Sequence, residues 1–186
     1  VPIYLDSPMA QDATAIFYKH AHEHRLSKDV AREVCHLPHY IQSVEESKAL
    51  HQSSYPSIIV SASGMLEGGR VLHHLAHFAP HSENAIILTG FQAGGTRGDR
   101  IQRGEREVRI HGSMVPIRAR VETLESLSSH ADYSEVLEWL SSFRSPPRKV
   151  FLTHGEPEAL EGLKQKIEER FDWTVCVPEY EQEFEL

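Results

Sequence analysis

Short apolar runs alternate with longer amphipathic stretches along this chain of 186 residues. Apolar runs bounded by glycine, proline, serine or asparagine predict strands, whereas apolar positions that recur every three or four residues predict helices. The predicted strands cover residues 1–6, 57–62, 84–89, 106–111, 115–122, 149–152 and 174–177, the first two as buried strands. Helices are predicted over 8–25, 43–51, 70–78, from about 133 to the prolines at 146 and 147, and from 156 onward. Strands that alternate with helices predict an α/β fold with a mainly parallel sheet.

Two histidines stand where a predicted strand gives way to a predicted helix. His130 lies in the segment Leu127–Asp132, and His154 lies in Thr153-His154-Gly155-Glu156. The carboxyl ends of strands are where open α/β sheets bind their ligands, so the two side chains are expected to face one site. The spacing alone does not name the chemistry.

Two glycine-rich segments follow predicted strands in the same way. Ser63-Gly64-Met65 comes after the strand 57–62, and the segment Gly90–Gly98 comes after the strand 84–89. Such turns present backbone N–H groups to an anion and let a ligand approach the main chain closely. Without further information, a tight turn and a long hairpin loop remain open as alternatives.

Charge is distributed unevenly along the chain. The net charge is −8, which argues against indiscriminate binding of nucleic acid. The segment 97–120 nevertheless holds seven arginines and three acidic residues, so that it carries +4 and the remainder −12. A local basic strip suits a phosphate-bearing ligand, and a solvated arginine-rich surface is the alternative.

Three features of the sequence indicate the cellular compartment of the protein. No run reaches the roughly 20 apolar residues of a membrane helix, and no signal peptide is visible. Cys35 and Cys176 lie far apart and form no metal-type pair, which predicts two free thiols in a reducing compartment. We therefore expect a cytoplasmic protein with no membrane partner.

Two pairs of histidines have the spacing at which side chains on one helix face could bind a metal ion. His20, Glu23 and His24 have the reversed spacing of zinc proteases, and His73 and His77 are also four residues apart. Histidine is frequent in this chain, so exposed or packed helix positions are the favoured interpretation. A helix-based metal-binding hydrolase that uses His20, Glu23 and His24 is kept as an alternative.

Four motifs together resemble a known family. The chain contains, in order, Ser61-Ala62-Ser63-Gly64-Met65, Gly90-Phe91-Gln92-Ala93-Gly94-Gly95-Thr96, Ser129-His130-Ala131-Asp132 and Thr153-His154-Gly155-Glu156. The set resembles the RNA-processing branch of the β-CASP family of metallo-β-lactamase-fold nucleases. The resemblance implies that His130 is a general acid or phosphate donor and that His154 is a zinc ligand. It also implies RNA contacts by Ser63, Gly64, Met65, Gln92, Gly94, Gly95, Thr96, Arg97 and Ser129.

The main metal motif of the family, His-x-His-x-Asp-His, is absent. A zinc site needs about three or four protein ligands, and His154 alone would supply one. The chain also opens on a predicted core strand with no lead-in. We therefore expect the C-terminal portion of a zinc-dependent ribonuclease whose full-length form holds two zinc ions, with no activity and at most weak zinc binding in this chain alone.

The resemblance also predicts the domain organisation and the partners. Residues 1–105 would be the later part of a β-CASP lobe, and residues 106–186 the C-terminal part of a metallo-β-lactamase αββα lobe. The expected partners are RNA, the N-terminal metallo-β-lactamase portion of the same protein, and a second copy or other contact that covers the sheet left open. A non-catalytic RNA-binding module is the other alternative, and the sequence does not choose between endonuclease and exonuclease action.

Overall fold

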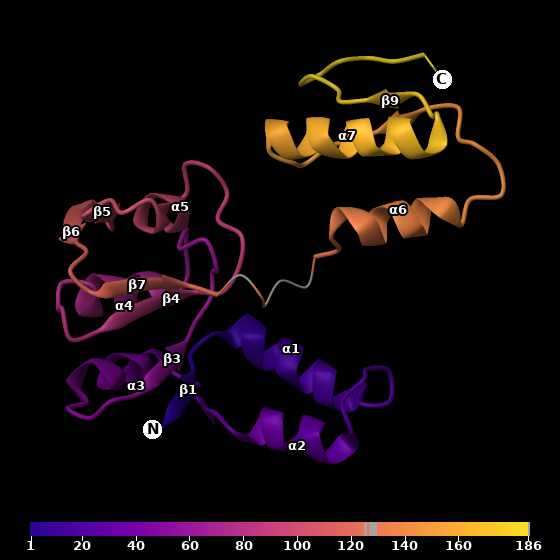
Figure 1. The fold of residues 1–186 in the computed structure, drawn as a ribbon. Helices are drawn as coiled ribbons and strands as arrows, with labels where there is room; N and C mark the ends of the chain where they lie inside the picture. The colour runs from indigo at the N-terminus through magenta and orange to yellow at the C-terminus, as the bar shows by residue number, and fades with distance from the viewer. Residues whose placement is uncertain (125, 127–129, 186) are drawn as a thin grey trace. The chain divides into compact units, whose positions relative to one another are not determined.

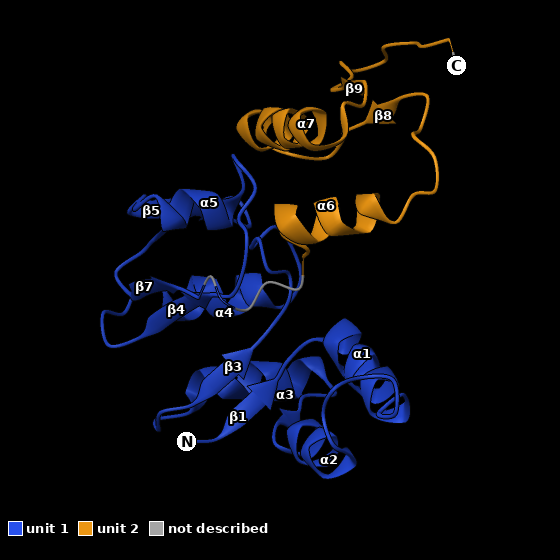
Figure 2. Ribbon diagram, turned by 45° about the vertical axis from the view of Figure 1, so that its right-hand side comes forward, with its two compact units in different colours: residues 1–128 blue, residues 129–186 orange. Residues whose placement is uncertain are grey.

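The computed structural model describes residues 1–124, 126 and 130–185, which belong to two compact units (Figures 1 and 2). Unit 1 is Val1–Ser128 and unit 2 is Ser129–Leu186. These units follow contacts within the fold. The boundary predicted near residue 105, between a β-CASP lobe and a metallo-β-lactamase lobe, is a different one and stays a prediction.

The first sheet of unit 1 is built around the N-terminal strand. Strand β1 (Ile3–Leu5) lies between β2 (His39–Tyr40) and β3 (Ile58–Val60), and both pairings are parallel. The helices of this part are α1 (Pro8–Lys19), α2 (Lys28–His36), α3 (Val44–Ala49) and the 3-10 helix η1 (Leu50–Gln52).

Helix caps in this part follow from sequence. The Ser7 hydroxyl accepts from the Ala10 N–H, Pro8 occupies the first turn of α1, and Ser43 with Glu46 forms a capping box on α3.

Two further sheets in the described part of unit 1 have two strands each. Strand β4 (Ala85–Leu88) pairs in parallel with β7 (Arg120–Thr123), and β5 (Glu107–Ile110) forms an antiparallel hairpin with β6 (Ser113–Pro116). The helices of this part of unit 1 are α4 (Val71–Phe78) and α5 (Arg97–Gln102). The core consists of Leu66, Leu72, Leu75, Ala79, Leu88, Ile101, Val108, Ile110 and Val115.

Unit 2 is a small α/β layer. Helix α6 (Tyr133–Ser141) leads to β8 (Val150–Phe151), and α7 (Pro157–Phe171) connects β8 to the parallel strand β9 (Val175–Cys176). Its core contains Leu137, Leu140, Ile167 and Val175. The predicted α/β class with mainly parallel strands flanked by helices is confirmed.

Several predictions of individual helices and strands were wrong. Helix α1 ends at Lys19 and not near Arg25, so His20 and His24 do not share a helix face. Strand β3 is an edge strand with Ile58 49% exposed, so it is not buried. The segment predicted as one strand over 115–122 is two, because β6 stays in the hairpin while β7 pairs with β4. Helix α5 was missed because glycines surround it.

Two composition-based expectations can be compared with the structure. Cys35 and Cys176 are both free thiols, as predicted. Over the described part of the chain, no helix is long and apolar enough to cross a membrane.

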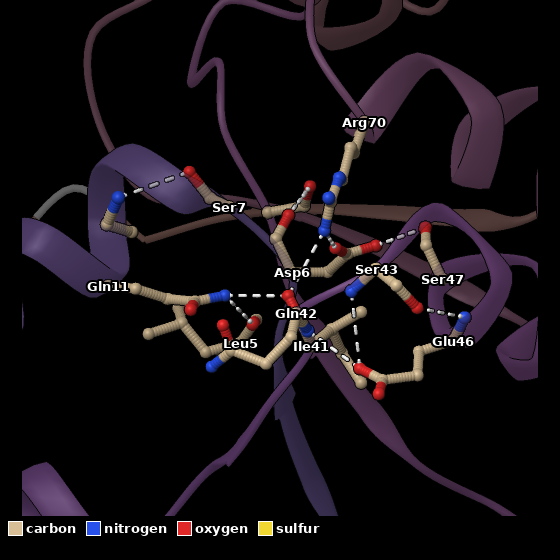
Figure 3. A network of polar contacts seen from close by, with 12 residues as sticks. Leu5, Asp6, Ser7, Gln11, Ile41, Gln42, Ser43, Glu46, Ser47 and Arg70 are labelled. Atoms are coloured by element: carbon tan, nitrogen blue, oxygen red, sulfur yellow. Dashed lines mark hydrogen bonds and ion pairs between the residues drawn. The ribbon is translucent and has the colours of Figure 1, made fainter.

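One buried carboxylate joins four segments of unit 1 (Figure 3). Asp6, which directly follows β1, is 0% exposed. Its carboxylate accepts from Ser47 Oγ on α3 (2.5 Å), from Arg70 at the start of α4 (2.5 Å) and from His74 Nε2 within α4 (2.7 Å). Its backbone carbonyl accepts from Ser61 Oγ (2.8 Å), at the end of β3.

The ionisation of Asp6 follows from these contacts. Burial alone would raise the pKa of this carboxyl, but the hydrogen bonds from Ser47, Arg70 and His74 outweigh burial, so the pKa lies below its usual value. The ionised form is therefore the form that unit 1 is built around.

The network continues from His74 to a second histidine. His51 Nε2 lies 3.0 Å from His74 Nδ1, and the His51 ring stacks on that of His77 with centroids 4.4 Å apart. Burial, followed by the charges of His74 and His77, lowers the pKa of His51 to about 4. His51 is therefore neutral in the folded protein at neutral pH.

We predict that Asp6→Ala destabilises unit 1 by about 3–5 kcal/mol, because it removes the only carboxylate that Arg70 contacts among the described residues. Urea unfolding followed by far-UV circular dichroism measures the loss. Asp12→Ala, on the exposed side of α1, is the matched control and should change stability by less than about 0.5 kcal/mol. A similar small effect of both changes would contradict the central place of Asp6.

We predict that the stability of unit 1 rises with pH between about 4 and 6.5, since unfolded His51 binds a proton in this range and folded His51 does not. One such proton gives at most about 1.4 kcal/mol per pH unit. The contribution of Asp6 is separate, because it is lost only as pH falls below the ordinary value of 3.8. Urea unfolding at pH 5 and pH 7 should show a smaller difference for His51→Gln than for the unaltered chain or for the exposed-site control His81→Gln.

Candidate functional site

The two glycine-rich segments predicted to contact one ligand lie against each other in unit 1. Gln92 Nε2 donates to the Gly64 carbonyl and to the Gly90 carbonyl, both at 3.1 Å. The Gly98 N–H donates to the Met65 carbonyl at 3.1 Å. The turn after β3 and the loop after β4 therefore form one joined surface, which we name the turn–loop surface (residues 61–70 and 90–98).

Arg97 makes the second link across this surface. Its backbone N–H donates to Glu67 Oε1 (2.7 Å), and its guanidinium donates to the Leu66 carbonyl (3.0 Å) and the Arg109 carbonyl (2.7 Å). One side chain thus connects the turn, the loop and strand β5.

A buried acid that sequence reasoning missed holds the loop in shape. Asp99, 7% exposed, accepts from the Gly95 N–H (2.9 Å) and from Arg103 Nε (2.6 Å). The Gly95 N–H, and then Arg103, lower the pKa of this carboxyl. Thr96 Oγ1 accepts from the Asp99 N–H (3.2 Å) and donates to Ala93 (2.7 Å). The short spacing between Thr96 and Asp99 was the available signal, as a helix N-cap followed by an acid in the first turn.

The structure separates the predicted RNA-binding residues into two groups. Gln92, Thr96 and Arg97 use side-chain donors to hold the turn–loop surface together. The exposed positions are Gly64, Met65, Gly94 and Gly95, while Ser63 is partly buried and Ser129 lies outside the described residues. Phe91, which no prediction included, is 62% exposed on the same loop. RNA contact by each of these residues stays a prediction.

The basic strip is largely neutralised. Four of its seven arginines contact carboxylates, in the pairs Arg97–Glu67, Arg100–Glu105, Arg103–Asp99 and Arg120–Glu122. Within the described residues, Arg106, Arg109 and Arg118 have no carboxylate partner. The structure thus favours the solvated-surface interpretation for most of the strip.

The two predicted site histidines both belong to unit 2 and both precede a helix. His130 is exposed two residues before Asp132, the N-cap of α6. His154 is exposed between β8 and α7, with φ +63°. Because α6 leads into β8 and α7 leads into β9, both helix N-termini lie at the carboxyl edge of this sheet. A left-handed backbone at a non-glycine residue is uncommon and marks His154 as a position under constraint.

Asp132 is the N-cap of helix α6. Its Oδ1 accepts from the N–H groups of Ser134 (2.8 Å) and Glu135 (3.0 Å) and from the Ser134 hydroxyl (2.5 Å). The Ser134 hydroxyl, followed by the N–H of Glu135, lowers the pKa of Asp132. The carboxylate is therefore a cap for α6.

The described residues contain no group of three or more histidine, cysteine, aspartate or glutamate side chains placed to hold a metal ion. In the first histidine cluster, His20 Nδ1 contacts Glu23 (2.7 Å), and His24 stacks on Phe17 with centroids 4.1 Å apart. In the second, His77 stacks on His51, and His73 stacks on His111 (4.7 Å). These contacts agree with packed or exposed histidines and count against the helix-based hydrolase.

Comparison with known proteins decides the family. A family model described as the Beta-Casp domain matches residues 1–101, and one described as the Zn-dependent metallo-hydrolase RNA specificity domain matches residues 114–178. The chain belongs to the β-CASP family of metallo-β-lactamase-fold nucleases. Membership makes it part of an RNA-processing nuclease family, as the motifs predicted.

Curated β-CASP relatives are longer than this chain. It is 39% identical to ribonuclease TTHA0252 of Thermus thermophilus over 87% of the chain and 38% of that relative. It is 31% identical to transcription termination factor FttA of Methanocaldococcus jannaschii (95% of the chain, 30% of the relative) and 33% identical to FttA of Thermococcus kodakarensis (96% and 29%). The chain thus spans about a third of their length.

We predict that Gly98→Ala separates the two halves of the turn–loop surface, because an added Cβ would overlap the Gln92 side-chain oxygen. Overpacking of this kind costs about 1–3 kcal/mol. Gly90→Ala is the matched control, since a Cβ there meets nothing within 4 Å. Hydrogen exchange of the amide at position 98 should accelerate in the first variant only, and equal protection in both would show that Gln92 does not hold the two segments together.

Proposed function

We propose that this chain is the C-terminal portion of a zinc-dependent ribonuclease and that it supplies RNA contacts, a general acid and one zinc ligand. The observation that carries the proposal is the turn–loop surface. Two β-CASP motifs 25 residues or more apart in sequence are held together by Gln92, Arg97 and the Gly98 N–H, and this arrangement leaves glycine backbone exposed. Glycine main chain at the surface lets the RNA backbone approach closely.

In this proposal the two histidines of unit 2 have different roles. His130 protonates the departing ribose oxygen, or donates to the scissile phosphate, as a residue with a near-neutral intrinsic pKa can. His154 supplies one imidazole ligand to zinc, which lowers the pKa of a bound water when it is present. The described residues alone do not complete a zinc site, so the other ligands would come from the N-terminal metallo-β-lactamase portion.

One face of the β8–β9 sheet supports the proposal that the N-terminal metallo-β-lactamase portion packs against unit 2. Val150 and Leu152 pack against the helices of unit 2, so Phe151 points to the opposite side, where it is 37% exposed. Phe151 contacts Phe184 there, with ring centroids 4.8 Å apart, beside a shallow pocket of about 350 Å³. A second sheet layer, as in an αββα lobe, would cover this apolar face.

Two further points belong to the proposal. The change from β-CASP to metallo-β-lactamase character is placed near residue 105, and the spans of the two family models, 1–101 and 114–178, support it. A cytoplasmic location is supported by the two free cysteines.

A second candidate function is a non-catalytic RNA-binding module. It is favoured by the lack, among the described residues, of a complete metal-ligand set. The two candidates make the same prediction for RNA binding by this chain and differ for hydrolysis once the N-terminal portion is supplied.

We predict far below one zinc per purified chain by elemental analysis, and no RNA cleavage by the chain alone. With the N-terminal portion supplied, cleavage should appear, and His130→Ala should slow it by about 10²–10⁴-fold without loss of zinc. His154→Ala should lower zinc content and rate together, while His77→Ala, on α4, should change neither. One or two zinc ions per isolated chain, or cleavage by it that His154→Ala abolishes, would contradict the proposal.

A further inference from the structure

Unit 2 carries a group of aromatic rings that its core does not use. Trp139 is 63% exposed and Phe143 is 44% exposed. The two rings meet edge to face with centroids 5.4 Å apart, and Phe143 also contacts Trp173 at 5.9 Å. Trp173 in turn stacks on Phe171 at 4.7 Å. The exposed rings are therefore held in place by partly buried ones.

The helix itself explains why these rings face outward. Leu137 and Leu140 turn toward the core of unit 2, whereas Trp139 and Phe143, four residues apart, share a different stripe of α6 and its continuation. Tryptophan is highly buried on average, so an exposed Trp139 beside an exposed Phe143 is an informative departure.

The segment that follows Trp139 is basic, although Glu135 and Glu138 precede Trp139 on α6 and Lys149 lies over the Phe151 ring. From Trp139 to Lys149 the sequence has three basic residues and no acidic one. Arg144 and Arg148 are exposed and, among the described residues, have no carboxylate partner. They differ in this from the arginines of the strip 97–120, most of which are neutralised. Arg170 also lies over the Phe171 ring at 5.3 Å.

This aromatic surface (Trp139, Phe143, Arg144 and Arg148) is separate from the candidate catalytic edge of unit 2. Trp139 and Phe143 stand at the carboxyl end of α6, and Trp173 follows the carboxyl end of α7. His130 and His154 precede the amino ends of the same helices. All these residues lie within 114–178, the span matched by the RNA specificity model.

We propose that the aromatic surface binds single-stranded RNA, with an unpaired base stacked on Trp139 and phosphates beside Arg144 and Arg148. The inference rests on the proposed function and names a second place where the same RNA is held. The carboxyl ends of helices carry partial negative charge and do not attract phosphate. Binding at this position therefore depends on base stacking and on the two arginines. Exposed aromatic rings with flanking arginines are what sequence-tolerant recognition of single strands requires.

The first experiment uses Trp139 as its own reporter. The chain has two tryptophans, so Trp173→Phe leaves Trp139 as the single emitter. Titration with a single-stranded oligoribonucleotide should quench its fluorescence with the same midpoint as binding measured by anisotropy of labelled RNA. A blunt-ended RNA duplex, in which every base is paired, should quench little. Unchanged Trp139 emission at saturating RNA would overturn the proposal.

The second experiment compares variants by RNA anisotropy. Trp139→Ala should weaken binding about tenfold or more, and Trp139→Phe should restore most of it, because stacking needs an aromatic face. Tyr180→Ala is the matched control, since Tyr180 is 92% exposed but has Glu179 and Glu181 as neighbours, and binding should not change. Arg144→Gln with Arg148→Gln should lower the salt dependence of binding.

Each outcome separates this surface from the proposed function. RNA binding that survives Trp139→Ala unchanged overturns the aromatic surface and leaves the proposed function standing. No binding of RNA by the unaltered chain overturns both. If Trp139→Ala converts a dimer into monomers in sedimentation and RNA affinity is unaltered, the surface is an interface between copies and the RNA assignment is wrong.

Discussion

The ionised Asp6 carboxylate is the contact on which the arrangement of unit 1 depends. A fully buried charge is tolerable only where hydrogen bonds replace water, and here a serine, an arginine and a histidine from two helices do so. The same residue ties down Ser61 through its carbonyl, one residue past β3. The start of α4 and the start of the glycine-rich turn are thereby fixed to the end of β1. The position of the turn–loop surface is thus set by contacts of the fully buried Asp6.

The turn–loop surface also changes which groups are available to RNA. A sequence view assigns binding to the polar side chains Gln92, Thr96 and Arg97, because these carry donors. In the fold Gln92 and Arg97 donate to carbonyls of the neighbouring segment, Thr96 donates to Ala93 in its own loop, and Gln92 is only 6% exposed. What remains at the surface is main chain at glycine, together with Met65 and Phe91. Recognition by backbone and rings, rather than by arginine charge, is also consistent with a protein whose net charge is −8.

Sequence patterns predicted the parallel α/β class and the strand–histidine–helix order around His154, because each depends on neighbours in sequence. They failed where distant segments compete. The segment 115–122 alternates like one strand, yet β7 leaves the hairpin for β4. Of the four arginine–acid pairs, only Arg97–Glu67 joins distant segments and was invisible for the same reason. The other three pairs join residues that are two to five positions apart. His20 and His24 matched a helical metal spacing only under the assumption that the helix continued past Lys19.

The two ends of unit 2 show different kinds of incompleteness. At the carboxyl edge, His130 and His154 are exposed without a metal-ligand set among the described residues, and Phe151, three residues before His154, is 37% exposed on the sheet. A second sheet layer that carries the remaining zinc ligands would both complete the metal site and cover Phe151. At the other end, Trp139 and Phe143 adjoin unpaired arginines instead of an apolar sheet, so a further protein layer would have to bury those charges at considerable cost. A flexible anionic strand meets the rings and the charges together. The exposed histidines at one end of the unit and the exposed rings at the other are therefore assigned to different partners.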